Sequence, residues 1–352
     1  MQIVAIILGV TILSLLLFLR YYPAFGAKWS GDKVVNEVDI GSNTIPGTTL
    51  SILKDFIRGN PNSKPSQPIS IFPADLGRSQ ESGTRVVWFG HSAFLIEIDG
   101  KTLLLDPMFG KAPTPFPWFG NQRYSKQLPI DIDQLPPIDA VLLSHDHYDH
   151  LDYGSIQKLK HKVGSFYTPR GVGRHLARWG VDRSKIHEFN WWEETEVAGL
   201  KLVCTPAIHF SGRYLLDNNS TLWCSWVIAS SEHKLFFSGD SGYGPHFKKI
   251  GDTYGPFHLT MLECGQYDER WPAIHMLPEQ TVQAQLDVQG KVMIPIHWGA
   301  FKLAFHDWTD PIERVIQAAK ERGVAIATPR IGEAVNVNAS QYPTAIWWKS
   351  YI

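Results

Sequence analysis

The chain has 352 residues, of which 44% are hydrophobic, 12% aromatic and 19% charged, and this composition excludes a disordered polymer. Three cysteines are too few for a disulfide-stapled secreted module, and a formal net charge of -1 provides no basic field to collect nucleic acid. The 14 histidines are numerous enough that their distribution along the chain becomes the main question.

An apolar run over residues 3–19 predicts a single-pass membrane anchor that occupies residues 1–22. A helix of about 17 residues reaches roughly 26 Å, which suffices for a thin hydrocarbon core. An arginine and two tyrosines follow at once, as is typical of a membrane interface. The alternative is a signal peptide cleaved near residues 24–26, but no lysine or arginine precedes the run. The basic residues after the run favour a main domain on the cytoplasmic side.

Residues 23–84 are predicted to form a linker and a segment that drapes over the main domain. They contain a turn-rich stretch at 60–68, and only 50–57 has the pattern of a short helix. From residue 85 to residue 352 we expect one catalytic domain, because no repeat, low-complexity tract or second boundary interrupts this part of the chain.

Strand-like and helical patterns are interspersed along this domain. Strands are predicted at 85–89, 93–98, 101–106, 140–143, 200–205, 223–229, 235–238, 259–262 and 292–296. Helices are predicted at 153–160, 173–179, 278–288 and 310–322. Asp99-Gly100 is a strong signal for a two-residue hairpin between the second and third strands. The order indicates a layered α/β or α+β domain with two sheets.

A dense group of metal-ligand side chains directly follows the predicted strand that ends at Leu143. The group reads H-x-H-x-D-H from His145 to His150, and imidazole and carboxylate suit zinc and related divalent ions. In a turn that leaves a strand, His145 and His147 can converge on one ion, whereas Asp149 and His150 can face a second. A metal centre is therefore predicted here in preference to a solvated polar loop.

Three further candidate ligands share this setting, because each directly follows an apolar strand: His209, Asp240 and His297. Taken singly, each has an ordinary alternative as a core histidine or a turn aspartate. Strand ends at one edge of a sheet converge in space, and α/β sheets place their sites there. We therefore expect all three to complete the metal centre.

This order of ligands resembles the metallo-β-lactamase superfamily of dinuclear metal hydrolases. The resemblance implies an α/β fold, an αβ/βα sandwich with two packed β-sheets flanked by helices, formed by residues 85–352. It implies one ion held by His145, His147 and His209, another held by Asp149, His150 and His297, and Asp240 as the bridge between them. Two Zn²⁺ ions per chain are the implied cofactor, although iron and manganese also occupy such sites.

Longer motifs at 135–153, 191–194, 239–243, 255–257 and 296–299 are similar to the N-acyl-phosphatidylethanolamine-hydrolysing phospholipase D branch. This resemblance extends from about residue 86 to residue 333.

The branch implies further site residues. Asp106 matches a catalytic aspartate near the metal site, and His275 matches a histidine near the substrate phosphate. Tyr153, Trp118 and Phe119 are further candidates for substrate binding. The segment around Trp118 departs from the family pattern, because it is richer in prolines and aromatic residues.

The implied function is a membrane-anchored, zinc-dependent phosphodiesterase that cleaves N-acyl-phosphatidylethanolamine to phosphatidic acid and an N-acylethanolamine. Two bridged ions lower the pKa of a bound water to about 7, so that a bridging hydroxide can attack the phosphate. Asp149 is a candidate to orient this hydroxide or to accept its proton. The expected partners are a phospholipid substrate and the membrane, and a homodimer is possible by resemblance.

Two alternatives stay open. One is a lactonase or another ester or amide hydrolase on the same dinuclear site. The other is a non-catalytic membrane protein that binds metal for structure, which is disfavoured because structural zinc sites are usually built on cysteine thiolates.

Overall fold

The computed structural model describes residues 8–14, 17–18, 22–25, 33–74, 83–214 and 217–352. The predicted anchor therefore lies partly outside the described residues; its described parts are mostly helical and exposed. Among the residues that are described, no helix combines the length and the apolar character that a bilayer crossing requires.

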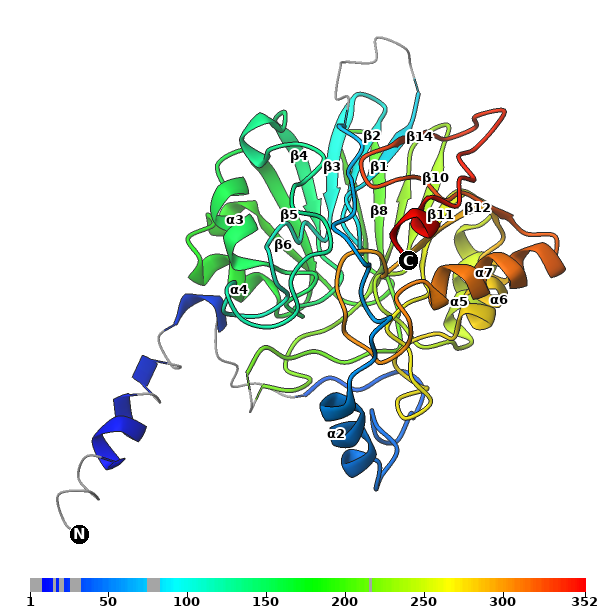
Figure 1. Cartoon of the computed structure of the whole chain (residues 1–352). Helices are drawn as coiled ribbons and strands as arrows, with labels where there is room; N and C mark the ends of the chain where they lie inside the picture. The colour runs from blue at the N-terminus through cyan, green and yellow to red at the C-terminus, as the bar shows by residue number, and fades with distance from the viewer. Residues whose placement is uncertain (1–7, 15–16, 19–21, 26–32, 75–82, 215–216) are drawn as a thin grey trace.

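Two seven-stranded mixed sheets stack face to face and form the centre of the domain (Figure 1). The first sheet has the order β14-β1-β2-β3-β4-β5-β6. Its strands are β1 (Arg85–Trp88), β2 (Phe94–Ile98), β3 (Lys101–Leu105), β4 (Ile138–Leu142), β5 (Val163–Pro169), β6 (Ile186–Phe189) and β14 (Ala334–Asn336). The second sheet has the order β13-β12-β11-β10-β9-β8-β7. Its strands are β7 (Glu194–Val197), β8 (Leu200–Thr205), β9 (Ser225–Ala229), β10 (Lys234–Phe237), β11 (Phe257–Glu263), β12 (Gly290–Ile296) and β13 (Ala325–Ile326).

Helices cover the outer face of each sheet, which gives the layer order αβ/βα (Figure 1). The first sheet carries α3 (Tyr153–Leu159) and α4 (Gly173–Arg178). The second carries α5 (His246–Tyr254), α6 (Pro278–Asp287) and α7 (Asp310–Glu321). Helix α2 (Thr49–Arg58) stands apart from both layers, and short 3-10 helices lie at Pro23–Phe25, Ile132–Gln134, Arg183–Lys185 and Trp347–Tyr351.

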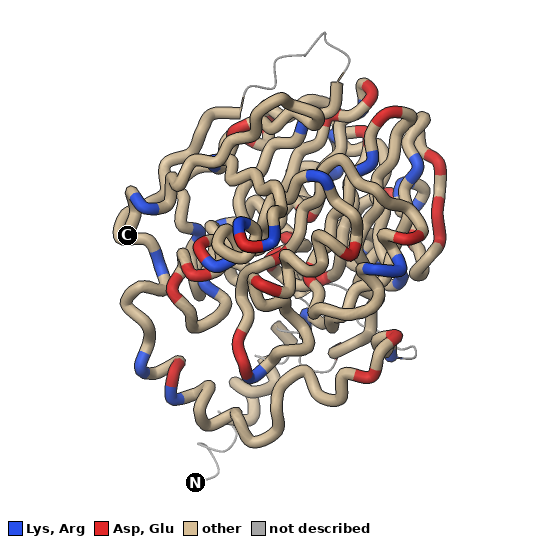
Figure 2. The backbone as a smooth tube through the Cα atoms, turned by 90° about the vertical axis from the view of Figure 1, so that its right-hand side faces the viewer, with Lys and Arg blue, Asp and Glu red and all other residues tan. Residues whose placement is uncertain are grey.

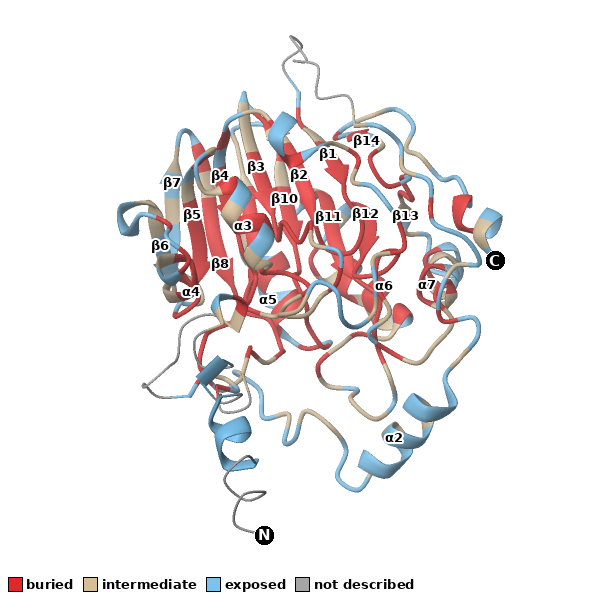
Figure 3. Cartoon of the chain, turned by 60° about the vertical axis from the view of Figure 1, so that its left-hand side comes forward, coloured by how far each residue is buried: buried red, intermediate tan, exposed pale blue. Residues whose placement is uncertain are grey.

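The alternation of side chains along the strands explains how the layers are held together. In β2, Phe94 and Ile96 belong to the core between the two sheets, whereas Leu95 belongs to the core beneath α3 and α4. In β4, Leu142 likewise belongs to the core between the sheets, and Val141 belongs to the core beneath the helices. Both faces of the central strands are thus mostly buried, as Figure 3 shows, and their sequences are correspondingly rich in apolar residues.

The predicted strands and helices of the domain lie within two residues of observed ones, but several elements were not predicted. Strands β6 and β7 have only half-buried and exposed positions, so they carry too few apolar residues to stand out. Strand β5 contains a glycine and a serine, and β13 and β14 have two and three residues. Helix α5 also went unpredicted.

The surface mixes both signs of charge. Lysine and arginine alternate with aspartate and glutamate along the face drawn in Figure 2. Residues 33–74 run over this surface and bond to the domain through backbone contacts, including those from Ile69 to Tyr124 and from Phe72 to Ile331.

Candidate metal centre

The candidate ligands meet at one edge of the sandwich, where several strands of both sheets end. The segment from His145 to His150 follows β4, His209 follows β8, Asp240 follows β10 and His297 follows β12. Strand β4 pairs in parallel with β3 and with β5, and β11 pairs in parallel with β10 and with β12, so the carboxyl ends of these strands are aligned at this edge. All of the predicted ligands fall into compact groups of potential ligand atoms.

The first group has four members whose ligand atoms all lie within 4.8 Å of one another: His145, His147, His209 and Asp240. The Nδ1 atom of His147 lies 2.9 Å from Nε2 of His145 and 3.2 Å from Nε2 of His209. Asp240 Oδ2 lies 3.8 Å and 3.7 Å from the same two Nε2 atoms. Four ligands around one point is the number that a tetrahedral divalent ion takes.

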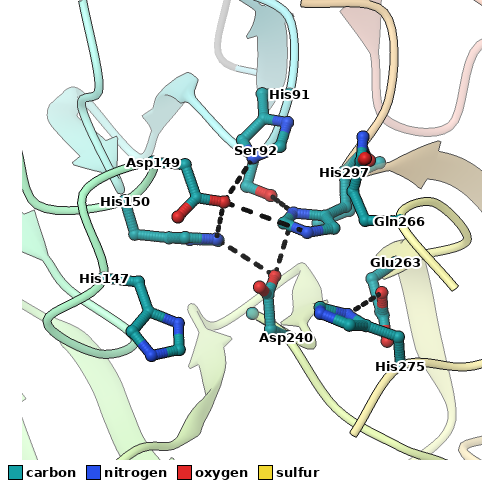
Figure 4. Close-up of polar contacts among 12 residues, drawn as sticks. His91, Ser92, His147, Asp149, His150, Asp240, Glu263, Gln266, His275 and His297 are labelled. Atoms are coloured by element: carbon teal, nitrogen blue, oxygen red, sulfur yellow. Dashed lines mark hydrogen bonds and ion pairs between the residues drawn. The ribbon is translucent and has the colours of Figure 1, made fainter. Parts of the chain in front are cut away.

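The second group contains Asp149, His150 and His297, as the resemblance implied, together with His91. Figure 4 shows these side chains converging on Asp149, whose Oδ2 lies 2.8 Å from Nε2 of His91 and 3.4 Å from Nε2 of His150. His91 was not predicted. It nevertheless follows the apolar strand β1 by three residues, so the signal that identified the other strand-end ligands was present for it too.

Asp240 connects the two groups. Its Oδ1 lies 3.1 Å from Nε2 of His150 and 3.0 Å from Nδ1 of His297, while its Oδ2 faces the first group. This is the arrangement of a carboxylate that bridges two ions. Burial raises the pKa of Asp240 to about 6, although His150 acts in the opposite direction.

The protonation states of four of the histidines suit metal ligation. Burial lowers the pKa of His147 to about 4, and it lowers the pKa values of His145, His209 and His297 well below the ordinary value. These imidazoles are therefore neutral near pH 7, and a neutral imidazole is the form that binds a metal. Nε2 of His150 and Oδ1 of Asp240 are buried at the centre and lie 3.1 Å apart, but they do not meet in hydrogen-bond geometry, which is the arrangement of two donor atoms that face a shared ion. The donor set thus fits a pair of divalent ions.

Asp106 lies behind His150, on the side away from the ligand groups. One of its oxygens lies 2.7 Å from Nδ1 of His150, and the other accepts the backbone N–H of Ser144 at 2.7 Å. A carboxylate in this position holds the imidazole in the tautomer whose Nε2 is free for a metal. Burial opposes the charged form of His150, but Asp240, Asp149 and Asp106 together raise its pKa well above the ordinary value.

His275 stands at the edge of the centre and forms a third group with Asp240 and His297. Its Nδ1 lies 3.1 Å from Oε2 of Glu263, and its ring extends from there toward Asp240 (Figure 4). Glu263 is fully buried and also accepts the backbone N–H of Met276 at 2.8 Å. Burial raises the pKa of Glu263 well above its usual range. The sequence had not indicated Glu263, because it lies inside β11 among apolar residues.

The other predicted substrate residues do not belong to these groups. Tyr153 begins α3 and packs edge-on against Trp179, with ring centroids 5.4 Å apart. Trp118 and Phe119 are exposed on a loop whose Phe116 packs against Trp118.

A family model described as the β-lactamase superfamily domain matches residues 101–298, more than half of the chain. The chain belongs to the metallo-β-lactamase superfamily. A solved metallo hydrolase from Ignicoccus hospitalis has the same fold, with a TM-score of 0.55 and 21% identity over 73% of this chain and 99% of the other.

Related sequences point to one branch of the superfamily. An uncharacterized protein of Mycobacterium tuberculosis is 41% identical over 85% of this chain and 80% of its own. The N-acyl-phosphatidylethanolamine-hydrolyzing phospholipase D 1 of Caenorhabditis elegans is 28% identical over 76% of this chain and 79% of its own. The mitochondrial enzyme of that name from Saccharomyces cerevisiae is 31% identical over 67% and 52%. These relatives support the phospholipase D-like branch that the motifs indicated, and the chain is a metal-dependent hydrolase of this fold.

Proposed function

We propose that the protein is a membrane-anchored phosphodiesterase of the phospholipase D type that uses two zinc ions. Its substrate would be N-acyl-phosphatidylethanolamine, and its products phosphatidic acid and an N-acylethanolamine. The observation that carries the proposal is the pair of ligand groups joined by Asp240, in a chain related to enzymes that are named for this reaction.

Two divalent ions at these groups would supply an activated water at neutral pH and would stabilise negative charge on a phosphoryl oxygen. The chain itself holds the ligands in place, through Asp106 behind His150 and His91 beside Asp149. His275 is positioned to donate a hydrogen bond to a phosphoryl oxygen, because Glu263 holds its Nδ1 side and leaves the other ring edge toward Asp240. Asp149 would accept a proton from the activated water. The residues that would contact the lipid are Tyr153, Trp118 and Phe119.

We also infer that residues 1–22 anchor the domain to a bilayer, with the domain on the cytoplasmic side. The described part of this segment exposes large apolar side chains: Leu8, Val10, Ile12, Leu13, Leu17 and Phe18. Such an anchor would raise the effective concentration of a lipid substrate at the metal centre.

A lactonase or another ester or amide hydrolase is the second candidate. The same ligand groups would serve it, and the exposed, proline-rich loop around Trp118 departs from the pattern of the phospholipase branch. This loop is where a change of substrate would arise.

The test is metal content and substrate cleavage measured on one detergent-solubilised preparation of the full chain. N-acyl-phosphatidylethanolamine would be offered beside a lactone and a generic phosphodiester. We expect two zinc ions per chain and release of phosphatidic acid. Two ions with turnover of the lactone alone would support the second candidate, and full lipid cleavage after complete removal of metal would refute both.

A further inference from the structure

Helix α2 presents a large apolar surface to solvent. It spans Thr49–Arg58, and none of its residues is buried. Leu50, Phe56 and Ile57 are each at least 75% exposed, and Leu53 is 52% exposed. Leu50, Leu53 and Ile57 are spaced by three and four residues, so they lie on one face of the helix. Figure 3 shows this helix projecting from the body of the domain.

The orientation of α2 is the reverse of that of an ordinary surface helix, which turns its apolar stripe toward the core. Here the half-buried positions are Ile52 and Asp55. Asp55 Oδ2 accepts a hydrogen bond from Arg270 at 2.8 Å, so an ion pair fixes the polar side of the helix to the domain. The apolar face is therefore held outward. Its burial would contribute hydrophobic stabilisation only if another apolar surface covered it.

The surroundings of α2 favour a lipid bilayer as the surface that covers its apolar face. Helix α2 and the apolar N-terminal helix project from the same end of the molecule (Figures 1 and 3). Lys54 and Arg58 are exposed on α2, where they can meet anionic head groups. The N-terminal segment also packs on an aromatic loop, through a stacked contact between Phe18 and Phe116 at 6.3 Å.

We propose that α2 is an interfacial helix that lies in the plane of a bilayer, with its apolar face among the lipid chains. Ten residues of helix reach only about 15 Å, half of a hydrocarbon core, so α2 is far too short to cross. A short helix with an apolar face and flanking basic residues is the kind that binds in the head-group region. This contact is additional to the anchor proposed at the N-terminus, and it does not depend on which ester the protein hydrolyses.

The same ion pair connects α2 to the metal centre. Arg270, which holds Asp55, lies on the segment that follows β11. Four residues further on, the carbonyl of Ile274 lies 2.9 Å from Nδ1 of His209, and His275 follows it. A bilayer bound to α2 would therefore lie close to the segment that positions His209 and carries His275. Docking of α2 would present the centre to substrates in the membrane.

A fluorescent label on α2 of the full chain tests this directly. The natural cysteines are all buried, so a cysteine at Leu53→Cys can be labelled selectively with an environment-sensitive dye. Ser231→Cys is the matched control, because Ser231 is exposed in the turn between β9 and β10. It lies two residues before His233, which contacts Thr84 just before β1. The start of β1 lies at the end of the sheets away from α2 (Figure 1). The probe vesicles are phosphatidylcholine with phosphatidylglycerol and contain no N-acylated lipid, so the result is independent of hydrolysis.

We expect the dye at position 53 to shift to the blue on addition of vesicles and to be quenched by a lipid-borne quencher, while the dye at position 231 stays unchanged. An unchanged dye at position 53 would overturn the proposal. A blue shift that precedes vesicle addition and depends on protein concentration would overturn it in favour of a second copy of the chain.

A second variant, measured without a label, excludes the possibility that the dye itself causes binding. This second measurement, unlike the first, rests on the proposed function: glutamine at all four exposed apolar positions of α2 should lower turnover of N-acyl-phosphatidylethanolamine in vesicles by about tenfold or more, because the buried apolar area is lost. Metal content and turnover of a short, soluble phosphodiester should be unchanged. Equal losses on both substrates would show that α2 acts on the fold and would refute membrane docking.

Discussion

Replacement of Asp106 by asparagine should weaken the second ligand group while leaving the first largely intact. The aspartate accepts the backbone N–H of Ser144 and holds Nδ1 of His150, both at 2.7 Å. Asparagine has the same shape but only one acceptor oxygen. If that oxygen faces Ser144, the amide NH₂ faces His150 and demands an acceptor at Nδ1. The proton then moves to Nε2, which is the atom that faces Asp240 and the second site.

The size of the effect follows from this change of tautomer. Loss of a partner that orients a ligating histidine typically lowers metal affinity by about 10- to 100-fold, or about 1.4–2.8 kcal/mol. Asp106 is fully buried, so bulk water cannot replace its carboxylate and we expect the upper part of that range.

The assay is a competition titration with a chelator, followed by metal analysis of the protein at each step. Asp152→Asn serves as the control, since Asp152 accepts the N–H of Ser155 at the start of α3 and asparagine caps helices equally well. We expect one weakened ion in Asp106→Asn and two unchanged ions in the control. Two tightly bound ions in Asp106→Asn would refute the proposed orientation of His150.

Three further predictions concern the same centre. His91→Ala removes the contact with Asp149 and should lower occupancy of the second site alone; loss of both ions together would contradict the two-group description. Glu263→Gln should reduce turnover about tenfold with full metal content, because an amide replaces the carboxyl group that positions Nδ1 of His275; an unchanged rate would exclude that role. Burial lowers the pKa of His147 from 6.5 to about 4, and it lowers those of His145, His209 and His297 as well. The unfolded chain therefore takes up protons first, and urea unfolding of the metal-free protein should show stability falling as the pH drops from 6.5 toward 4. Asp240 opposes this trend, because its pKa is raised from 3.8 to about 6 and the folded chain takes up its proton first, so stability that rises over this range would show that Asp240 dominates.

The sequence was most informative where both faces of an element are buried. Strands such as β2 and β4 are mostly apolar, with one acidic residue each, because one face packs on the opposite sheet and the other on helices. Edge strands β6 and β7 have no such requirement, since much of their surface meets solvent, and their polar sequences did not predict strands. The short helix expected at 50–57 is present as α2, but its amphipathic pattern alone does not tell which face meets the domain.

For the metal centre, the sequence by itself determined the chemistry of the ligands and their local order, because the turn after β4 carries an unbroken H-x-H-x-D-H pattern and each later ligand follows an apolar strand. Only the tertiary structure decided the supporting contacts. Asp106 meets His150 across 44 residues, and His91 meets Asp149 across 58. Such pairs depend on how two sheets stack and how their strand ends align, and no local pattern in the chain encodes that alignment. The same holds for α2: the ion pair of Asp55 with Arg270 and the exposure of the opposite, apolar side appear only in the tertiary structure.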